Sequence, residues 1–224
     1  MAYSVAIDGP AGAGKSTIAK LISREMGYIY VDTGAMYRAM AVYFSKNKVN
    51  PEDESAINEA VKNVDIKIEY QNGEQQVILN GENVTGLLRT EETGKMASKT
   101  SKYAAVRTKL VALQRGLAKK TDVIMDGRDI GTTVLPDAFA KIYLTASSDA
   151  RAKRRYDELK EKGENCSFDA IKEDIEKRDY EDMHRAISPL KQADDAVLVD
   201  TSDMNIEQVV AALSKIIDEK KAGR

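Results

Sequence analysis

Short apolar runs with the length of buried strands recur along the chain, and stretches with a helical spacing of apolar residues separate them. In one such stretch, Ile18, Leu21, Ile22 and Met26 form a single stripe that Gly27 ends. This alternation predicts an α/β fold with a five-stranded, mostly parallel sheet and helices on both faces. The predicted strands cover residues 3–8, 28–31, 123–126, 141–145 and 196–200. The predicted helices cover residues 15–26, 34–46, 51–63, 90–101, 104–119, 149–162, 168–184 and 205–220.

Residues 64–88 depart from this pattern, because polar and apolar positions alternate there with a period of two. The alternation covers residues 65–70 and 75–80, and Asn72-Gly73 between them is typical of a tight hairpin turn. Asn80-Gly81 marks a second turn before a short third strand. The pattern predicts a small antiparallel sheet inserted into the α/β chain.

Composition and charge restrict the class of protein further. The chain has 224 residues, of which 42% are hydrophobic and 31% charged, and a net charge of -2, so no global basic field favours nucleic acid or anionic membrane. The only cysteine, Cys166, permits no intrachain disulfide, as expected in a reducing cytosol. The N-terminus does not have the pattern of a signal peptide, and no apolar window has the length of a membrane span. We therefore expect a cytoplasmic protein.

The strongest motif lies between the first predicted strand and the first predicted helix. It matches G-x-x-x-x-G-K-[ST], in which glycines leave backbone amides open to phosphate at a helix N-terminus. Lys15 is expected to reach the β- and γ-phosphates of a nucleoside triphosphate, and the Ser16 hydroxyl to face Mg²⁺. Asp126, at the end of a later strand, is either a water-mediated partner of Mg²⁺ or a structural carboxylate. The predicted ATP-binding residues of this loop are Gly9, Pro10, Ala11, Gly12, Ala13, Gly14, Lys15, Ser16 and Thr17.

The motif alone shows nucleotide binding and not the reaction, so other patterns must decide the class. A GTPase needs a guanine-reading Asn-Lys-x-Asp, and Asn47-Lys48-Val49-Asn50 does not match it. In place of the Asp-Glu that ends the Walker B strand of large ATPase motors, the chain has Asp126-Gly127-Arg128-Asp129.

Arginines at helical spacing favour a kinase that transfers a phosphoryl group from one nucleotide to another. Such an enzyme must neutralise the phosphates of both nucleotides and exclude water. Arg151, Arg154 and Arg155 share one predicted helix face, and three cations there repel one another unless an anion lies between them. Arg178 and Arg185 share another face with Asp182, which suits a sugar hydroxyl and a phosphate. The alternative for both sets is solvated charge on surface helices.

Four segments resemble the bacterial cytidylate kinases, and the resemblance runs along nearly the whole chain. Besides the loop, they are Asp32-Thr33-Gly34-Ala35-Met36-Tyr37-Arg38, Asp126-Gly127-Arg128-Asp129-Ile130-Gly131-Thr132 and Arg185-Ala186-Ile187-Ser188-Pro189-Leu190. The resemblance implies a P-loop core of residues 1–32 and 104–224 with a helical lid at about 149–182, and an acceptor-binding region of residues 33–103 with the antiparallel insert at 64–88.

The resemblance also implies a role for individual residues. Lys15, Arg128, Arg151, Arg155 and Arg185 would be catalytic, and Arg154 would bind ATP in the lid. The residues that would bind the acceptor are Thr33, Tyr37, Arg38, Ser98, Arg107, Arg128, Asp129, Arg178, Asp182 and Arg185. For three of these residues a structural role is the alternative to acceptor binding. Ser98 would then face solvent, Arg107 would be a surface cation and Tyr37 would be a core residue.

The acceptor is predicted to be CMP or dCMP. Asp129 can accept a hydrogen bond from the exocyclic amine of cytosine, as carboxylates do when they read cytosine in DNA, whereas uracil presents an acceptor there. ATP with Mg²⁺ is the expected donor, transfer is direct and in line, and a monomer is expected. Two alternatives stay open: a kinase for UMP or for a small metabolite such as shikimate, and a regulator that binds ATP without turnover.

Overall fold

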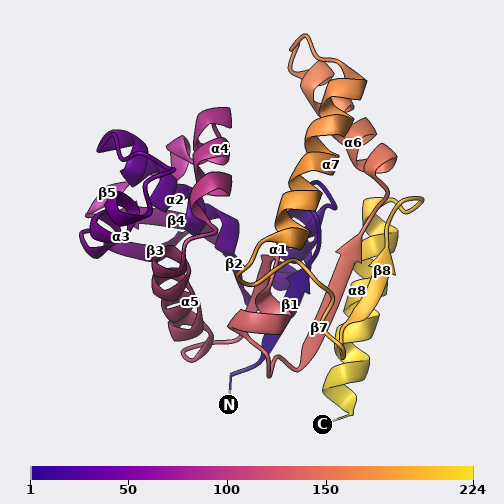
Figure 1. Ribbon diagram of the computed structural model, residues 1–224. Helices are drawn as coiled ribbons and strands as arrows, with labels where there is room; N and C mark the ends of the chain where they lie inside the picture. The colour runs from indigo at the N-terminus through magenta and orange to yellow at the C-terminus, as the bar shows by residue number, and fades with distance from the viewer. Residues whose placement is uncertain (1, 224) are drawn as a thin grey trace. The chain divides into compact units, whose positions relative to one another are not determined.

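The computed structural model describes residues 2–223, which form two compact units (Figure 1). One unit contains the chain up to Tyr30 and again from Thr121 onward, and the other contains Val31–Lys120. Each unit has a hydrophobic core of its own residues, as separate domains do. The nucleotide loop motif belongs to the first unit, which is called the core unit below, and the segment Thr33–Arg38 belongs to the second unit.

A five-stranded sheet has the order β2-β6-β1-β7-β8, and it belongs to the core unit except for the second half of β2, which begins the other unit. The central strand, β1, pairs in parallel with β6 and β7, and β7 pairs in parallel with β8. Because parallel strands end at one edge of a sheet, the loops after β1, β6 and β7 meet there. The strands are β1 (Ser4–Asp8), β2 (Ile29–Asp32), β6 (Val123–Gly127), β7 (Ala140–Thr145) and β8 (Val197–Asp200).

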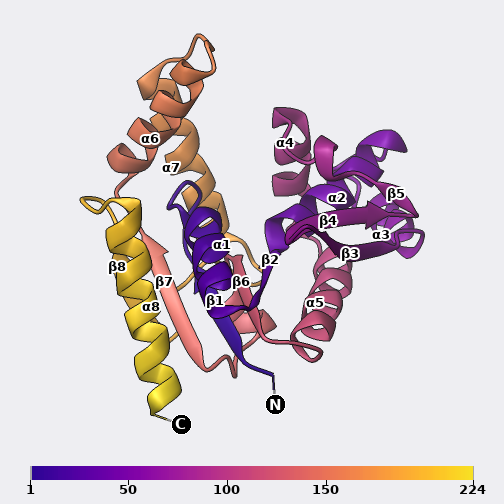
Figure 2. The same ribbon diagram turned by 180° about the vertical axis from the view of Figure 1, so that it is seen from behind.

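Helices α1 and α8 pack against each other and against the sheet, as the rear view shows (Figure 2). Their buried side chains, such as Ile22 and Leu213, form one core with Ile7 and Ile142 of the central strands. Helices α6 and α7 form a separate packed pair beyond β7 (Figure 1). The helices of the core unit are α1 (Lys15–Met26), the short π-helix η2 (Ile130–Val134), α6 (Ser148–Glu161), α7 (Phe168–His184) and α8 (Ile206–Ala222).

The second unit confirms the predicted antiparallel insert. β3 and β4 pair antiparallel across Asn72 and Gly73, whose φ angles of 54° and 77° are typical of a type I′ turn. β5 extends the sheet after the second Asn-Gly turn. The elements of this unit are α2 (Thr33–Lys46), α3 (Glu54–Lys62), β3 (Ile66–Gln71), β4 (Glu74–Leu79), β5 (Glu82–Asn83), the 3-10 turn η1 (Thr85–Leu87), α4 (Glu91–Thr100) and α5 (Ala104–Ala118).

The predicted fold class is confirmed: the sheet, its parallel order and the inserted hairpin are all present. Two features differ from the sequence-based expectation. Helix α5 groups with the second unit, because Val106 and Leu110 lie in that unit's core, whereas the predicted core region began at residue 104. The π-helix η2 has no periodicity that could predict it, since it is only five residues long. Among the described residues, no helix is both long enough and apolar enough to cross a bilayer.

Candidate active site

The loop between β1 and α1 has the backbone of an anion-binding site. Gly12 and Gly14 have φ angles of 76° and 87°, in the left-handed region that glycine adopts without a steric penalty. Gly14 is the residue that precedes α1, so the loop delivers its amides to a helix N-terminus. Lys15 begins the helix, is buried, and donates from Nζ to the carbonyl oxygen of Pro10 at 2.7 Å. The loop and its lysine are therefore positioned to bind the phosphates of a nucleotide.

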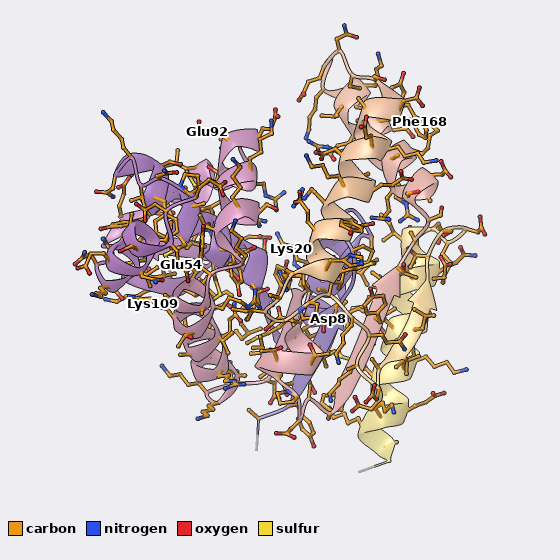
Figure 3. The ribbon with its side chains drawn as sticks, viewed as in Figure 1. Asp8, Lys20, Glu54, Glu92, Lys109 and Phe168 are labelled. Atoms are coloured by element: carbon orange, nitrogen blue, oxygen red, sulfur yellow. The ribbon has the colours of Figure 1, made fainter. Side chains whose placement is uncertain are left out.

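Asp8 and Lys15 lie in buried surroundings at the base of this loop. Asp8, labelled in Figure 3, ends β1, and its two carboxylate oxygens accept hydrogen bonds from the backbone amides of Ile130 (2.8 Å) and Gly131 (2.7 Å). Burial raises the pKa of Asp8 to about 6, although these two hydrogen bonds oppose the shift. Burial, followed by the nearby cation Arg128, lowers the pKa of Lys15 to about 7. An anion in the loop would favour the charged form of this lysine.

A hydroxyl and a carboxylate lie together beside the loop. The Ser16 hydroxyl donates to Asp126 Oδ2 at 2.8 Å, and the Tyr30 hydroxyl donates to Asp126 Oδ1 at 2.9 Å. Asp126 is buried at the end of β6, the neighbour of β1 in the sheet. Hydroxyl and carboxylate oxygens are hard ligands of the kind that Mg²⁺ prefers. The pair Ser16 and Asp126 therefore fits the predicted Mg²⁺ site, and Tyr30 is a participant that the sequence did not indicate.

A cluster of charged groups joins the end of β6 to helix α7. Arg128 Nε donates to Asp182 Oδ2 at 2.7 Å, and Arg185 lies 3.6 Å from Asp182 Oδ1 and 3.6 Å from Asp129 Oδ1. Burial is the largest single influence on Asp182 and opposes its ionisation, but the charge and hydrogen bond of Arg128, together with other arginines, lower the pKa of this carboxyl. Burial likewise acts to lower the pKa of Arg128, but the charge and hydrogen bond of Asp182, together with other carboxylates, raise it. The structure thus brings four predicted acceptor-binding residues together, while Arg178 is exposed on the same helix.

Each of the three arginines of α6 has protein partners of its own. Arg151 is buried and contacts Asp179, Ala146 and Ala11. Arg154 donates to the carbonyl oxygen and the hydroxyl of Thr201. Arg155 is paired with Glu158 on the exposed face of α6. Protein oxygens therefore already balance part of the charge of these three cations.

A cavity of about 710 Å³ adjoins the phosphate loop. Its walls come from the loop and the start of α1, from α6, and from the segment after β8 together with the start of α8. All of these elements belong to the core unit. Arg151, Arg154 and Arg155, which the sequence analysis selected, line this cavity. The sequence analysis missed the residues after β8 and at the start of α8, because they match no motif. These missed lining residues include Thr201, Met204, Asn205, Ile206 and Val209.

In the second unit, the residues around Arg38 form a compact turn at the start of α2. Asp32 precedes the helix, and its Oδ1 accepts from the amide of Ala35 at 2.8 Å while its Oδ2 pairs with Arg38 Nη2 at 2.9 Å. A side chain at Gly34 would lie about 3 Å from the Arg38 guanidinium, so glycine leaves room for this arginine. Thr33, the first residue of α2, is buried. The sequence segment therefore holds Arg38 against Asp32 at the start of α2.

Tyr37 and Arg107 also meet in the second unit, from α2 and α5. The guanidinium carbon of Arg107 lies 5.6 Å from the centre of the Tyr37 ring, within the range of a cation–π contact. Arg107 is buried and donates to the carbonyl oxygen of Ser101 at 3.3 Å, so it is not the surface cation of the alternative interpretation. Ser98 lies on α4 and is partly buried.

The residues of both units match known proteins over nearly the full chain. The family model described as cytidylate kinase matches residues 5–219. The chain belongs to the cytidylate kinase family. Among curated relatives, a cytidylate kinase of Lactobacillus gasseri is 52% identical over 97% of this chain and 94% of its own. A cytidylate kinase of Caldicellulosiruptor bescii is 48% identical over 96% of this chain and 94% of its own. The resemblance described from the sequence is confirmed.

Solved structures add evidence on the fold of this cytidylate kinase family member. A shikimate kinase from Bacteroides thetaiotaomicron superposes with a TM-score of 0.51 at 10% identity, covering 96% of this chain and 98% of its own. At that identity the similarity concerns the fold alone. It agrees with the fold described above.

Proposed function

We propose that this protein transfers the γ-phosphate of ATP to CMP or dCMP and so produces CDP or dCDP. The observation that carries the proposal is the match of the cytidylate kinase family model to residues 5–219. Curated relatives about half identical to this chain have the same name, and the loop, its lysine and the arginine cluster supply the groups that such a transfer needs. We expect the enzyme to act in the cytoplasm as a monomer.

On the donor side, the loop Gly9–Ser16 would hold the ATP phosphates through its amides and Lys15. The adjoining cavity supports placing the nucleoside of ATP against Thr201, Met204 and Ile206. Ser16 would hold Mg²⁺ with Asp126 behind it, and the ion when bound neutralises developing charge on the phosphates. Lys15 would leave the carbonyl oxygen of Pro10 and turn to the phosphates, where an anion favours its charged form.

On the acceptor side, the charge of the arginines and the hydrogen-bonding groups of cytosine support the predicted roles. Asp129 would accept from the exocyclic amine of the base, and Arg107 and Ser98 would donate to its ring nitrogen and carbonyl oxygen. Arg38, Arg128 and Arg185 would bind the acceptor phosphate, with Thr33 and Tyr37 lining the same site. Arg178 and Asp182 would read the sugar. These assignments rest on the family and on the contacts within each unit.

The chemistry that follows needs no covalent intermediate. An oxygen of the acceptor phosphate is ionised at neutral pH and can attack the γ-phosphorus in line, so no general base is required. Lys15, Arg128 and Arg185 would stabilise the charge that spreads over the transferred group. Closure of the helix pair α6 and α7, with Arg154 and Arg155, would exclude water from the reaction.

Turnover of a panel of acceptors tests this proposal. ADP release is measured with ATP and Mg²⁺ in the presence of CMP, dCMP, UMP, AMP, GMP or dTMP, beside a control without acceptor. We expect CMP and dCMP to be far faster than the others, with little ADP in the control. Preferred turnover of UMP would contradict the role of Asp129. ATP binding without any diphosphate product would favour the alternative that the protein is a regulator, which binds ATP without turnover.

The Asp126→Asn variant tests the assignment of the Mg²⁺ site. Asparagine keeps the shape but removes the charge that orients the Ser16 hydroxyl. We expect the Mg²⁺ concentration for half-maximal rate to rise about 10- to 100-fold, as for other groups that orient metal ligands. The measurement is a Mg²⁺ titration of the rate at saturating ATP and CMP. Asp137→Asn, at an exposed position, is the control, and an unchanged titration curve for Asp126→Asn would contradict the assignment.

A further inference from the structure

Arg151 ties three segments of the core unit together. Its Nε donates to the carbonyl oxygen of Ala146 at 2.9 Å, and its Nη1 donates to the carbonyl oxygen of Ala11 at 2.9 Å. Its Nη2 lies 2.6 Å from Asp179 Oδ2. The guanidinium thus joins the approach to α6, the phosphate loop and helix α7. These contacts involve all three guanidinium nitrogens and use three of the five N–H donors of this arginine.

Asp179 is the group that holds this arginine in place. Its side chain is 12% exposed and that of Arg151 is 5% exposed, so the pair is removed from water. Within residues 2–223, the second oxygen of Asp179, Oδ1, is buried and accepts no hydrogen bond. A buried ion pair adds little to stability, because desolvation cancels much of the attraction. A function in orientation therefore explains this pair better than a function in stability.

The contact with Ala11 has a direct consequence for the phosphate loop. The carbonyl of Ala11 and the amide N–H of Gly12 belong to one planar trans peptide group, so they point in opposite directions. When Arg151 holds the carbonyl, the Gly12 N–H is turned away from Arg151 and stays available as a donor. The site for a side chain on Gly12 lies 3.5 Å from Arg151 Cβ, so the stem of the arginine also lies against the loop.

We propose that Asp179 is a positioning residue for ATP: through Arg151 it fixes the Ala11–Gly12 peptide so that the Gly12 amide can donate to the phosphates. The proposal rests on the proposed function only in that the loop binds ATP. It gives Arg151 a role in orienting the loop, in addition to the catalytic role in the lid that the family resemblance implied. It also connects the loop to α7, the helix that contains Arg178 and Asp182 on either side of Asp179.

Two variants separate orientation from folding. Asp179→Asn removes the charge that holds the guanidinium but keeps the size of the side chain. Arg151→Lys keeps a cation beside Asp179 but lacks the planar fork that reaches Ala11 as well. Asp174→Asn makes the same change in charge at an exposed position of α7 and is the matched control.

The test is calorimetric binding of a non-hydrolysable ATP analogue with Mg²⁺, without acceptor, and separately of CMP, with thermal unfolding measured for each variant. We expect Kd for the analogue to rise about tenfold or more in both variants, while Kd for CMP and all constants of Asp174→Asn stay within about twofold. If Asp179→Asn fails to fold, Arg151→Lys decides alone. The proposal would be overturned if a folded variant bound the ATP analogue as tightly as the parent does. It would also be overturned if the affinities for the analogue and for CMP fell equally, or if both variants failed to fold. A parent that does not bind CMP would contradict the proposed acceptor and would leave the ATP result valid.

Discussion

Arg128→Ala is expected to lower kcat/KM for phosphoryl transfer by about 10³-fold or more, the range reported for arginines that stabilise the transferred phosphate. Arg128 lies at the end of β6 beside the phosphate loop, and its charge is held in place by Asp182 at 2.7 Å. Alanine removes a cation from a site where two groups of phosphates must meet. It also leaves Asp182 with one cation fewer, so the remaining negative charge repels the acceptor. Both effects oppose the approach of the acceptor phosphate to the γ-phosphate of ATP.

Steady-state kinetics with varied CMP and ATP, together with thermal unfolding, measure this effect. Arg128→Lys keeps the charge but loses the planar fork, so its activity should lie between those of the parent and the alanine variant. Lys153→Ala is the control, because Lys153 is an exposed cation of α6 paired with Asp157, and its activity should stay within about twofold of the parent. Near-full activity in a folded Arg128→Ala variant would remove the main reason for the arginine assignments.

Gly9→Ala is expected to prevent stable folding of the core unit. A Cβ at this position would lie 1.9 Å from the carbonyl oxygen of Leu144, and Gly9 has a φ of 150° that other residues rarely adopt. The obstacle is backbone of β7, the direct neighbour of β1, so no side chain can rotate to make room. Strain and overpacking together should cost about 3 kcal/mol or more, a large part of the stability of a typical domain.

Denaturant unfolding and the yield of soluble protein measure this second effect. Gly163→Ala is the matched control: Gly163 has a φ of 76°, but a Cβ there would meet no atom within 4 Å. Its cost should therefore be limited to about 1–2 kcal/mol of backbone strain. If Gly9→Ala unfolded at the same denaturant concentration as Gly163→Ala, the close approach of the loop to Leu144 would not limit the choice of residue.

The parts of the fold that depend on neighbouring residues could be read from the sequence. The loop Gly9–Ser16 and the turns at Asn72-Gly73 and Asn80-Gly81 each depend on a few consecutive residues whose side chains, or lack of them, favour the conformation. Apolar spacing likewise predicted the strands and helices, because a strand or helix that buries one face repeats its pattern along the chain. The antiparallel insert was predicted for the same reason.

The tertiary structure decided which distant residues share a site. Asp8 meets the amides of Ile130 and Gly131 only because β1 lies beside β6 in the sheet, and no spacing along the chain expresses that order. Arg107 was assigned from the family resemblance, and only the packing of α2 with α5 placed it against Tyr37.

The arginines of α6 show that the sequence also does not predict which residues contact a given side chain. Their spacing put Arg151, Arg154 and Arg155 on one helix face, and all three line one cavity in the structure. Spacing does not reveal that each arginine contacts a different partner, which is Asp179, Thr201 or Glu158. Asp179 and Thr201 lie outside α6, so the pattern along that helix cannot indicate them. The sequence by itself therefore determined the local elements, the phosphate loop and the family, because these depend on short-range patterns. The tertiary structure decided the partners of each charge, because these depend on the order in which the strands and helices pack.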